Sequence, residues 1–124
     1  MRPTIPCFKT KIIETHCHLD YLVDGLLNAA VHEAEAVGID RLITIAVSEE
    51  NLSIVRKIAG SFEQVWCTQG IHPHEAQTWN HQLELKVRDG CMGNKVVALG
   101  EIGLDYHYNH SDRKIQADAF EAQL

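Results

Sequence analysis

Residues 14–20 read Glu-Thr-His-Cys-His-Leu-Asp and place a His-x-His motif directly after an apolar run. In a β-strand, residues two apart point to the same side, so the imidazoles of His16 and His18 can reach one point. Two neutral imidazoles that converge at a strand end are suitable ligands for a divalent metal. A motif this short also fits two exposed polar residues in a loop. Other polar residues of the chain that are predicted to lie near His16 and His18 therefore decide between a metal site and an exposed loop.

Apolar runs and helical spacings alternate along the chain. Nearly continuous apolar runs are typical of strands covered on both faces, and apolar residues three and four apart are typical of helices. We expect strands at residues 11–15, 41–47, 65–70 and 96–100, and helices at 24–37, 48–59, 79–91 and from Ser111 or Asp112 onward. Ser48 is expected to cap the second helix, and Gly38 to end the first in a left-handed conformation. In the last helix, Ile115, Ala119 and Phe120 are expected to face the core.

This order predicts an α/β fold of parallel strands joined by right-handed crossovers. Two architectures fit it, a doubly wound sheet and a β/α barrel. No Gly-x-Gly-x-x-Gly follows the first strand, which argues against a dinucleotide-binding sheet. In a barrel, chemistry gathers at the C-terminal ends of the strands. Four polar residues fall at such ends, namely His16, His18, His72 and Glu101.

Composition limits the class of protein. The 124 residues, 45% hydrophobic and 23% charged, suit one modest globular domain. A net charge of −6 argues against tight binding of nucleic acid through phosphates alone, so a metal would have to supply positive charge for a phosphorylated substrate. The four cysteines form no Cys-x-x-Cys, and residues 1–10 do not resemble a signal peptide. We therefore expect buried, unbridged thiols at Cys17 and Cys67, no membrane partner and a cytoplasmic location.

Three motifs together resemble one known family. Residues 15–20, 70–74 and 100–106 read Thr-His-Cys-His-Leu-Asp, Gly-Ile-His-Pro-His and Gly-Glu-Ile-Gly-Leu-Asp-Tyr. They are similar to the signatures of TatD-type metal-dependent deoxyribonucleases, which belong to the amidohydrolase-like barrel superfamily. The last helix is similar too, through Gln116, Phe120, Gln123 and Leu124. The resemblance extends over the chain from about Ile13 onward.

The resemblance implies a TIM-type (β/α)8 barrel, one or two divalent metal ions (Mg, Mn or Zn) and hydrolysis of phosphodiester bonds, typically of DNA from the 3′ end. His16 and His18 would hold one metal, and Glu101 would bridge to a second and serve as the catalytic carboxylate. Asp105 would orient a ligand or the substrate, and His72 would contact the substrate or act as an accessory ligand. A bridging carboxylate suits two cations ~3.5–4 Å apart, which activate water and stabilise both oxygens of the displacement.

Each of these residues also has a purely structural interpretation. Glu101 can be an ordinary carboxylate at a strand end, Asp105 can bond the backbone amides of its own turn, and His72 can be a structural histidine before a proline turn. His74 is expected at the rim of the site. The histidines without a motif are expected at the surface, and two aromatic residues in the core; these are His32, His81, His107, His110, Trp79 and Phe120.

The chain also departs from the family pattern. Glu14 stands where the family often has Asp, and a full barrel is about twice this length. A full member also takes two further histidines and a metal-binding aspartate from its second half. We therefore expect residues 1–124 to form a single partial domain, the first four βα units of a barrel, with an open sheet edge and exposed apolar strand faces.

The incomplete site leaves the function of the isolated chain open. Its missing C-terminal half, or another chain, would be needed to complete the barrel. The alternatives are a non-catalytic half-barrel that dimerises or binds a partner, and a hydrolase of another ester or amide.

Overall fold

The fold is four β/α units in sequence. It is known from a computed structural model, which describes residues 4–23 and 25–124. The strands are β1 (Ile12–Cys17), β2 (Ile39–Thr44), β3 (Val65–Gln69) and β4 (Val96–Leu99). The helices are α1 (Leu26–Ala36), α2 (Leu52–Ser61), α3 (His81–Cys91) and α4 (Arg113–Gln123), with short 3-10 helices η1 (Leu19–Tyr21) and η2 (Pro73–Thr78).

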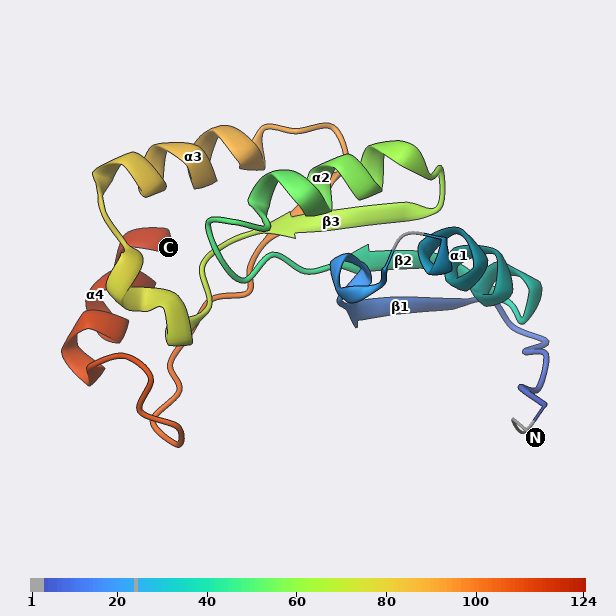
Figure 1. Cartoon of the computed structure of the whole chain (residues 1–124), viewed down its shortest axis with the longest axis horizontal. Coiled ribbons are helices and arrows are strands. Elements are labelled where there is room, and N and C mark those ends of the chain that lie inside the picture. The colour runs from blue at the N-terminus through green and yellow to red at the C-terminus, as the bar shows by residue number, and fades with distance from the viewer. Residues whose placement is uncertain (1–3, 24) are drawn as a thin grey trace.

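The sheet decides between the two predicted architectures. Its strands are all parallel and lie in the order β1-β2-β3-β4. A doubly wound sheet reverses its strand order at a switch point, whereas a barrel adds strands one after another. Helices α2 and α3 lie together on one face of the sheet (Figure 1). Sequential order therefore favours the barrel, of which these are four consecutive units.

The core lies between the sheet and its helices. Leu52, Val55, Ile58 and Ala59 of α2 are buried, as predicted from their spacing. They pack in one cluster with residues from β2, β3 and α3, including Leu42, Val65, Cys67, Leu83 and Val87. All four cysteines are described and their thiols are free, as expected for Cys17 and Cys67. Cys67 is buried as predicted, whereas Cys17 is only half-buried. Burial raises the pKa of the Cys67 thiol to about 11, so this thiol is inert at neutral pH.

Several predicted boundaries are wrong. The second helix begins at Leu52 and not after Ser48. Asn51 occupies the N-cap position, but its side chain makes no bond to the helix, because its Oδ1 accepts the amide protons of Val47 and Ser48 in the preceding turn. Strand β2 ends at Thr44, and residues 45–47 leave the ladder to bond other strand ends. The first helix begins at Leu26, and the predicted start at Asp24 lies outside the described residues. Gly38 does adopt the predicted left-handed conformation (φ +100°).

The last helix is also packed differently from the prediction. Asp112 caps α4 by accepting the amide protons of Lys114 and Ile115, as expected for one of the two candidate caps. Ala119 is buried, but Ile115 is 43% exposed. The buried positions on this helix are instead the two polar residues Gln116 and Gln123. Helix α4 packs against η2 rather than against the sheet, and this different partner explains the change of face.

The two outer strands expose apolar side chains. Ile13 of β1 is 57% exposed, and Val97 and Leu99 of β4 are 49% and 37% exposed. Each of these strands pairs on one side only within the described residues. The expected open edges and exposed strand positions are therefore present. No helix in the described part of the chain is long and apolar enough to cross a membrane.

Candidate metal centre

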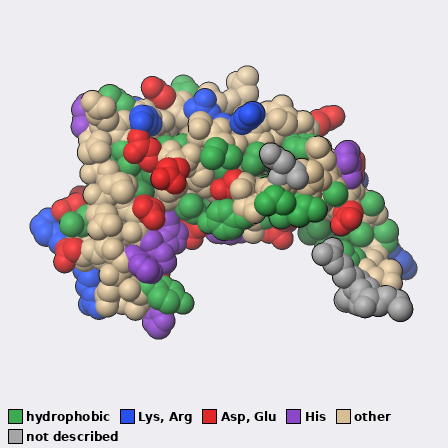
Figure 2. Space-filling model, viewed as in Figure 1, with side chains coloured by type: hydrophobic (Ala, Val, Ile, Leu, Met, Phe, Trp, Pro, Cys, Tyr) green, Lys and Arg blue, Asp and Glu red, His purple; other side chains and the backbone are tan. Residues whose placement is uncertain are grey.

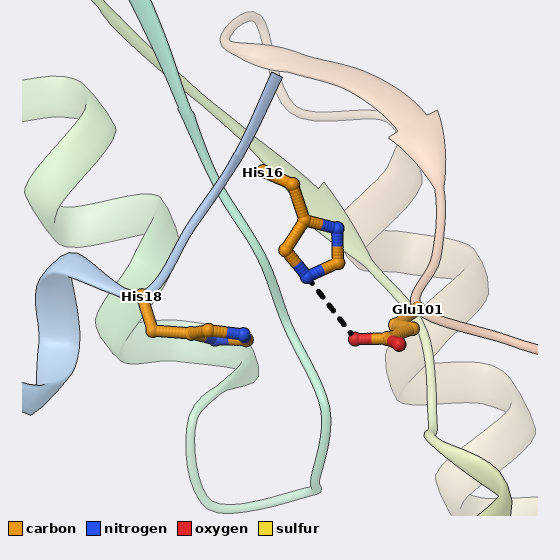
Figure 3. A group of neighbouring side chains, drawn as sticks. All are labelled: His16, His18 and Glu101. Carbon is orange, nitrogen blue, oxygen red and sulfur yellow. Dashed lines mark ion pairs between the residues drawn. The ribbon is translucent and has the colours of Figure 1, made fainter. Parts of the chain in front are cut away.

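Three side chains meet at the C-terminal ends of β1 and β4. His16 and His18 come from the end of β1, and Glu101 comes two residues after β4. One nitrogen of each histidine and one oxygen of the carboxylate all lie within 4.8 Å of one another. His16 Nε2 and Glu101 Oε2 are 3.5 Å apart (Figure 3). The structure thus brings together the three residues that the sequence singled out as ligands, although they are 85 positions apart in the sequence at their widest.

The backbone at the strand ends places Glu101 in this group. The amide of Gly100 donates to the carbonyl of Gln69 (2.9 Å), and the amide of Glu101 donates to the carbonyl of Ala46 (2.8 Å). The chain after β4 therefore crosses the end of β3 to reach the end of β2. Gly70 makes this crossing possible, because a Cβ atom there would lie 2.6 Å from the carbonyl carbon of Gly100.

The two histidines are held by their own neighbours. Glu14 accepts the amide proton of His16 through Oε1 (2.9 Å). The ring of His18 stacks on Tyr21, with centroids 4.9 Å apart and planes at 11°. Nδ1 of His18 is buried and has no hydrogen-bond partner among the described residues. A buried nitrogen costs free energy when unpaired, so this ring is suited to a partner that the protein itself does not supply.

The donor set fits a divalent cation. Two imidazoles and one carboxylate are ligands that Zn²⁺ and Mn²⁺ accept readily, whereas Mg²⁺ prefers oxygen ligands alone. Three protein ligands leave positions open for water or for ligands from elsewhere, as in catalytic sites. The unpaired nitrogen of His18 and the convergence of the three groups are therefore compatible with binding of a divalent cation.

His72, which follows β3, faces the same carboxylate from the other side. Its Nε2 lies 3.5 Å from Glu101 Oε1, and its Nδ1 accepts the amide proton of His74 (3.1 Å). A neutral imidazole whose Nδ1 accepts must carry its proton on Nε2, which then has no lone pair for a metal. Burial lowers the pKa of His72 and so favours this neutral form. Of the two predicted roles, the geometry favours the substrate contact over the accessory ligand.

Asp105 lies outside the group of three and binds His74. Its Oδ2 is 2.5 Å from His74 Nε2, and its Oδ1 accepts the amide protons of His107 and Tyr108. The hydrogen bond from His74 is the main reason that the pKa of Asp105 falls to about 2. The structural interpretation of Asp105 therefore applies, since one oxygen bonds the turn and the other orients His74. Its predicted role toward a ligand or the substrate stays a prediction.

These residues surround one cavity of about 360 Å³. Its lining consists of His16, His18, Tyr21, Val47, His72, His74, Glu75 and Glu101. Figure 2 shows histidine side chains gathered where the sheet meets the lobe that contains α4. His74 lines the cavity itself, whereas the sequence placed it at the rim. Tyr21 and Glu75 were missed, because nothing in their local pattern marks them.

The remaining predictions concern the histidines outside the motifs and two aromatic residues. His32, His81, His107 and His110 are exposed, as predicted. His110 is nevertheless part of the site's surroundings, because its ring lies 4.4 Å from that of His74. Trp79 packs against the core, and Phe120 is half-buried.

Comparison with known proteins gives a consistent result. The family described as TatD related DNase matches residues 13–124. The chain is 39% identical over 98 residues to the 3′-5′ ssDNA/RNA exonuclease TatD of Musicola paradisiaca, covering 78% of this chain and 37% of that protein. The protein of the same name from Yersinia pseudotuberculosis is 40% identical over 92 residues, covering 74% and 35%.

Two solved structures share the fold. A TatD homologue from Escherichia coli superposes with a TM-score of 0.76 at 25% identity, covering 90% of this chain and 44% of that one. A TatD family hydrolase from Entamoeba histolytica gives a TM-score of 0.79 at 21% identity, covering 97% and 46%. The chain spans less than half the length of these curated and solved relatives. Across that span, it belongs to the TatD-related DNase family.

Proposed function

We propose that this chain carries half of the active site of a metal-dependent nuclease, which hydrolyses phosphodiester bonds of DNA from the 3′ end. The observation that carries the proposal is the convergence of His16, His18 and Glu101 within 4.8 Å at the strand ends. The names of the relatives, 3′-5′ ssDNA/RNA exonucleases, support the reaction and the class of substrate. A reduced, cytoplasmic compartment fits the four free thiols.

In this proposal, His16 and His18 would hold one cation and Glu101 would take part in holding a second. A divalent ion there would supply an activated water and positive charge for the phosphate, which a chain of net charge −6 otherwise lacks. Zn²⁺ and Mn²⁺ fit the nitrogen-rich donor set better than Mg²⁺ does.

Other residues position these groups. His72 Nε2 lies 3.5 Å from Glu101 Oε1, so the proton on this nitrogen faces the carboxylate. The same proton can be donated to a phosphate oxygen that enters the cavity. Asp105 fixes the ring of His74, whose backbone amide in turn fixes the tautomer of His72. These groups therefore position the carboxylate and the substrate rather than bind the metal.

The site needs further ligands, and we propose that they come from a second half-barrel, on another segment or another chain. Ile13 of β1 and Val97 and Leu99 of β4 support this, because they expose apolar surface at the two edges where further strands would add. The 124 residues alone are then expected to show little or no nuclease activity. The same exposed edges favour the second candidate function, a non-catalytic half-barrel that pairs with itself or with a partner.

The test begins with the intact mass and oligomeric state of the purified chain, followed by an exonuclease assay on short single-stranded DNA with and without a chelator. No turnover by a verified monomer, together with binding of Zn²⁺ or Mn²⁺ that Glu101→Gln weakens, is the expected result. Turnover by the monomer would refute the incomplete site, and absence of metal binding would refute the metal centre. A stable dimer that binds no metal would favour the non-catalytic module. Parallel assays on amide and other ester substrates test the remaining type of hydrolase.

A further inference from the structure

Exposed tyrosine rings lie on two sides of the metal cavity. Tyr21 lines the cavity and is 68% exposed. Tyr108 is 64% exposed, and its ring meets that of His74, which lines the cavity, with centroids 5.8 Å apart. Both rings therefore offer aromatic surface beside a polar cavity, and a flat ligand can stack on such a surface.

Both rings are held in place by histidines. Tyr21 stacks on His18 in a nearly parallel arrangement, with planes at 11°. Tyr108 lies between His107, which meets it edge-on at 4.6 Å, and His110, which stacks on it at 5.9 Å with planes at 30°. The loop that carries Tyr108 is itself fixed, because Asp105 accepts the Tyr108 amide proton and Asn109 takes a left-handed conformation (φ 52°). Both rings are thus in contact with neighbouring side chains that constrain their positions.

We propose that Tyr21 and Tyr108 are a stacking site for unpaired nucleobases, on either side of the nucleotide whose phosphate occupies the cavity. This inference rests on the proposed function and specifies how the substrate is held. Base stacking on an aromatic ring is insensitive to charge, so it offers binding free energy that a chain of net charge −6 does not gain from phosphates. A duplex keeps its bases stacked inside, so this site selects single strands.

A neighbouring tyrosine provides a matched control. Tyr106 lies in the same loop and is 43% exposed, but the guanidinium of Arg113 already lies over its ring at 4.6 Å. Tyr106 also differs from Tyr21 and Tyr108 in its place, because among the described residues its ring makes no aromatic contact with a residue of the cavity lining. Tyr106→Ala and Tyr108→Ala remove the same group from the same loop, and differ in whether a ring beside the cavity is lost.

The experiment measures binding of two 5′-fluorescein-labelled single strands by anisotropy, one ending in a 3′ adenosine nucleotide and one ending in an abasic residue. A chelator is present, so that nothing is hydrolysed. The intact chain should prefer the strand with the base, and Tyr108→Ala should weaken binding of that strand by ~5-fold or more while leaving the abasic strand unchanged. Tyr108→Phe and Tyr106→Ala should both retain the preference. A Tyr21→Ala variant should lose part of it.

Equal binding of the two strands by the intact chain, including no binding of either, would overturn the stacking site. Loss of the preference in Tyr106→Ala as well would attribute the effect to the loop as a whole and would also overturn it. These outcomes are distinct from failure of the proposed function. A chain that prefers the base but binds no metal would refute the metal centre alone.

Discussion

The substitution Gly70→Ala tests how the fold places Glu101. A Cβ atom at residue 70 would lie 2.6 Å from the carbonyl carbon of Gly100, and 2.8 Å from its Cα and its oxygen. This is about 0.8 Å short of the 3.4 Å at which ordinary contact begins, and the obstructing atoms are backbone. The end of β4 must therefore move away from the end of β3, and Glu101 moves with it.

The expected cost has two parts. Overpacking of this kind lowers the free energy of unfolding by ~1–3 kcal/mol. A displacement of Glu101 on the order of 1 Å also separates its carboxylate from His16 and His18, so the dissociation constant for Zn²⁺ or Mn²⁺ should rise by ~10-fold or more. Urea unfolding measures the first effect, and calorimetric titration with Zn²⁺ or Mn²⁺ measures the second.

Gly60→Ala is the matched control, because it adds the same methyl group in α2, where nothing lies within 4 Å. A glycine in a helix is flexible in the unfolded chain, so this change should raise the free energy of unfolding by ~0.4–1 kcal/mol and leave metal binding unchanged. The two substitutions should therefore have opposite signs. If Gly70→Ala were as stable as the original chain and bound metal equally well, the close crossing of the strand ends would not be what positions Glu101.

Three further substitutions test other parts of the site. Glu101→Gln keeps the shape of the side chain but removes its charge, so the dissociation constant for Zn²⁺ or Mn²⁺, measured by titration, should rise at least ~10-fold. The control Glu75→Gln changes another carboxylate of the cavity and should have little effect on metal binding. Asp105→Asn should lower the free energy of unfolding, measured with urea, above about pH 4, and the loss should shrink as the pH falls toward 2. The reason is that the pKa of Asp105 is lowered to about 2 in the fold, and a carboxyl with a lowered pKa stabilises the fold only while it is ionised. A loss of stability that does not depend on pH would contradict this. Gln116→Ala removes three hydrogen bonds of a buried side chain and should lower the free energy of unfolding by ~2–4 kcal/mol, more than Ile115→Ala, which changes a 43% exposed residue and should cost under ~1 kcal/mol.

The grouping of the candidate ligands was predictable because their positions follow from the fold class. In a parallel β/α sheet, residues after the strands share one edge, so His16, His18, His72 and Glu101 had to gather there once the alternation was recognised. The second layer of contacts was not predictable in the same way. The pairing of His74 with Asp105, and the approach of His110 to His74, depend on the path of the loop after β4, and loop paths are set by tertiary contacts that leave no periodic pattern.

The capping residue of α2 shows a second limit of local rules. Ser48 has the right chemistry for a helix cap, but Asn51 takes that place. Its amide is also needed elsewhere, because Nδ2 donates to Asp20 Oδ2 at 3.0 Å, 31 positions away. A propensity scale ranks both residues as good caps. The Asn51 side chain instead bonds Val47, Ser48 and Asp20 and leaves the helix uncapped by a side chain, which no local rule anticipates.

The buried glutamines of α4 show why hydrophobic periodicity failed in that helix. Periodicity assumes that the inner face of a helix meets apolar side chains. Helix α4 instead packs on the loops that follow β3 and β4, whose backbone groups have no strand to bond. Gln123 exchanges hydrogen bonds with the amide and carbonyl of Ile71, and Gln116 does the same with those of Asp105. Burial there requires polar side chains, because an apolar one would leave those backbone groups unpaired. The two glutamines therefore fix the loops that carry His72 and Asp105, so that the helix farthest along the chain sets the positions of residues in the site.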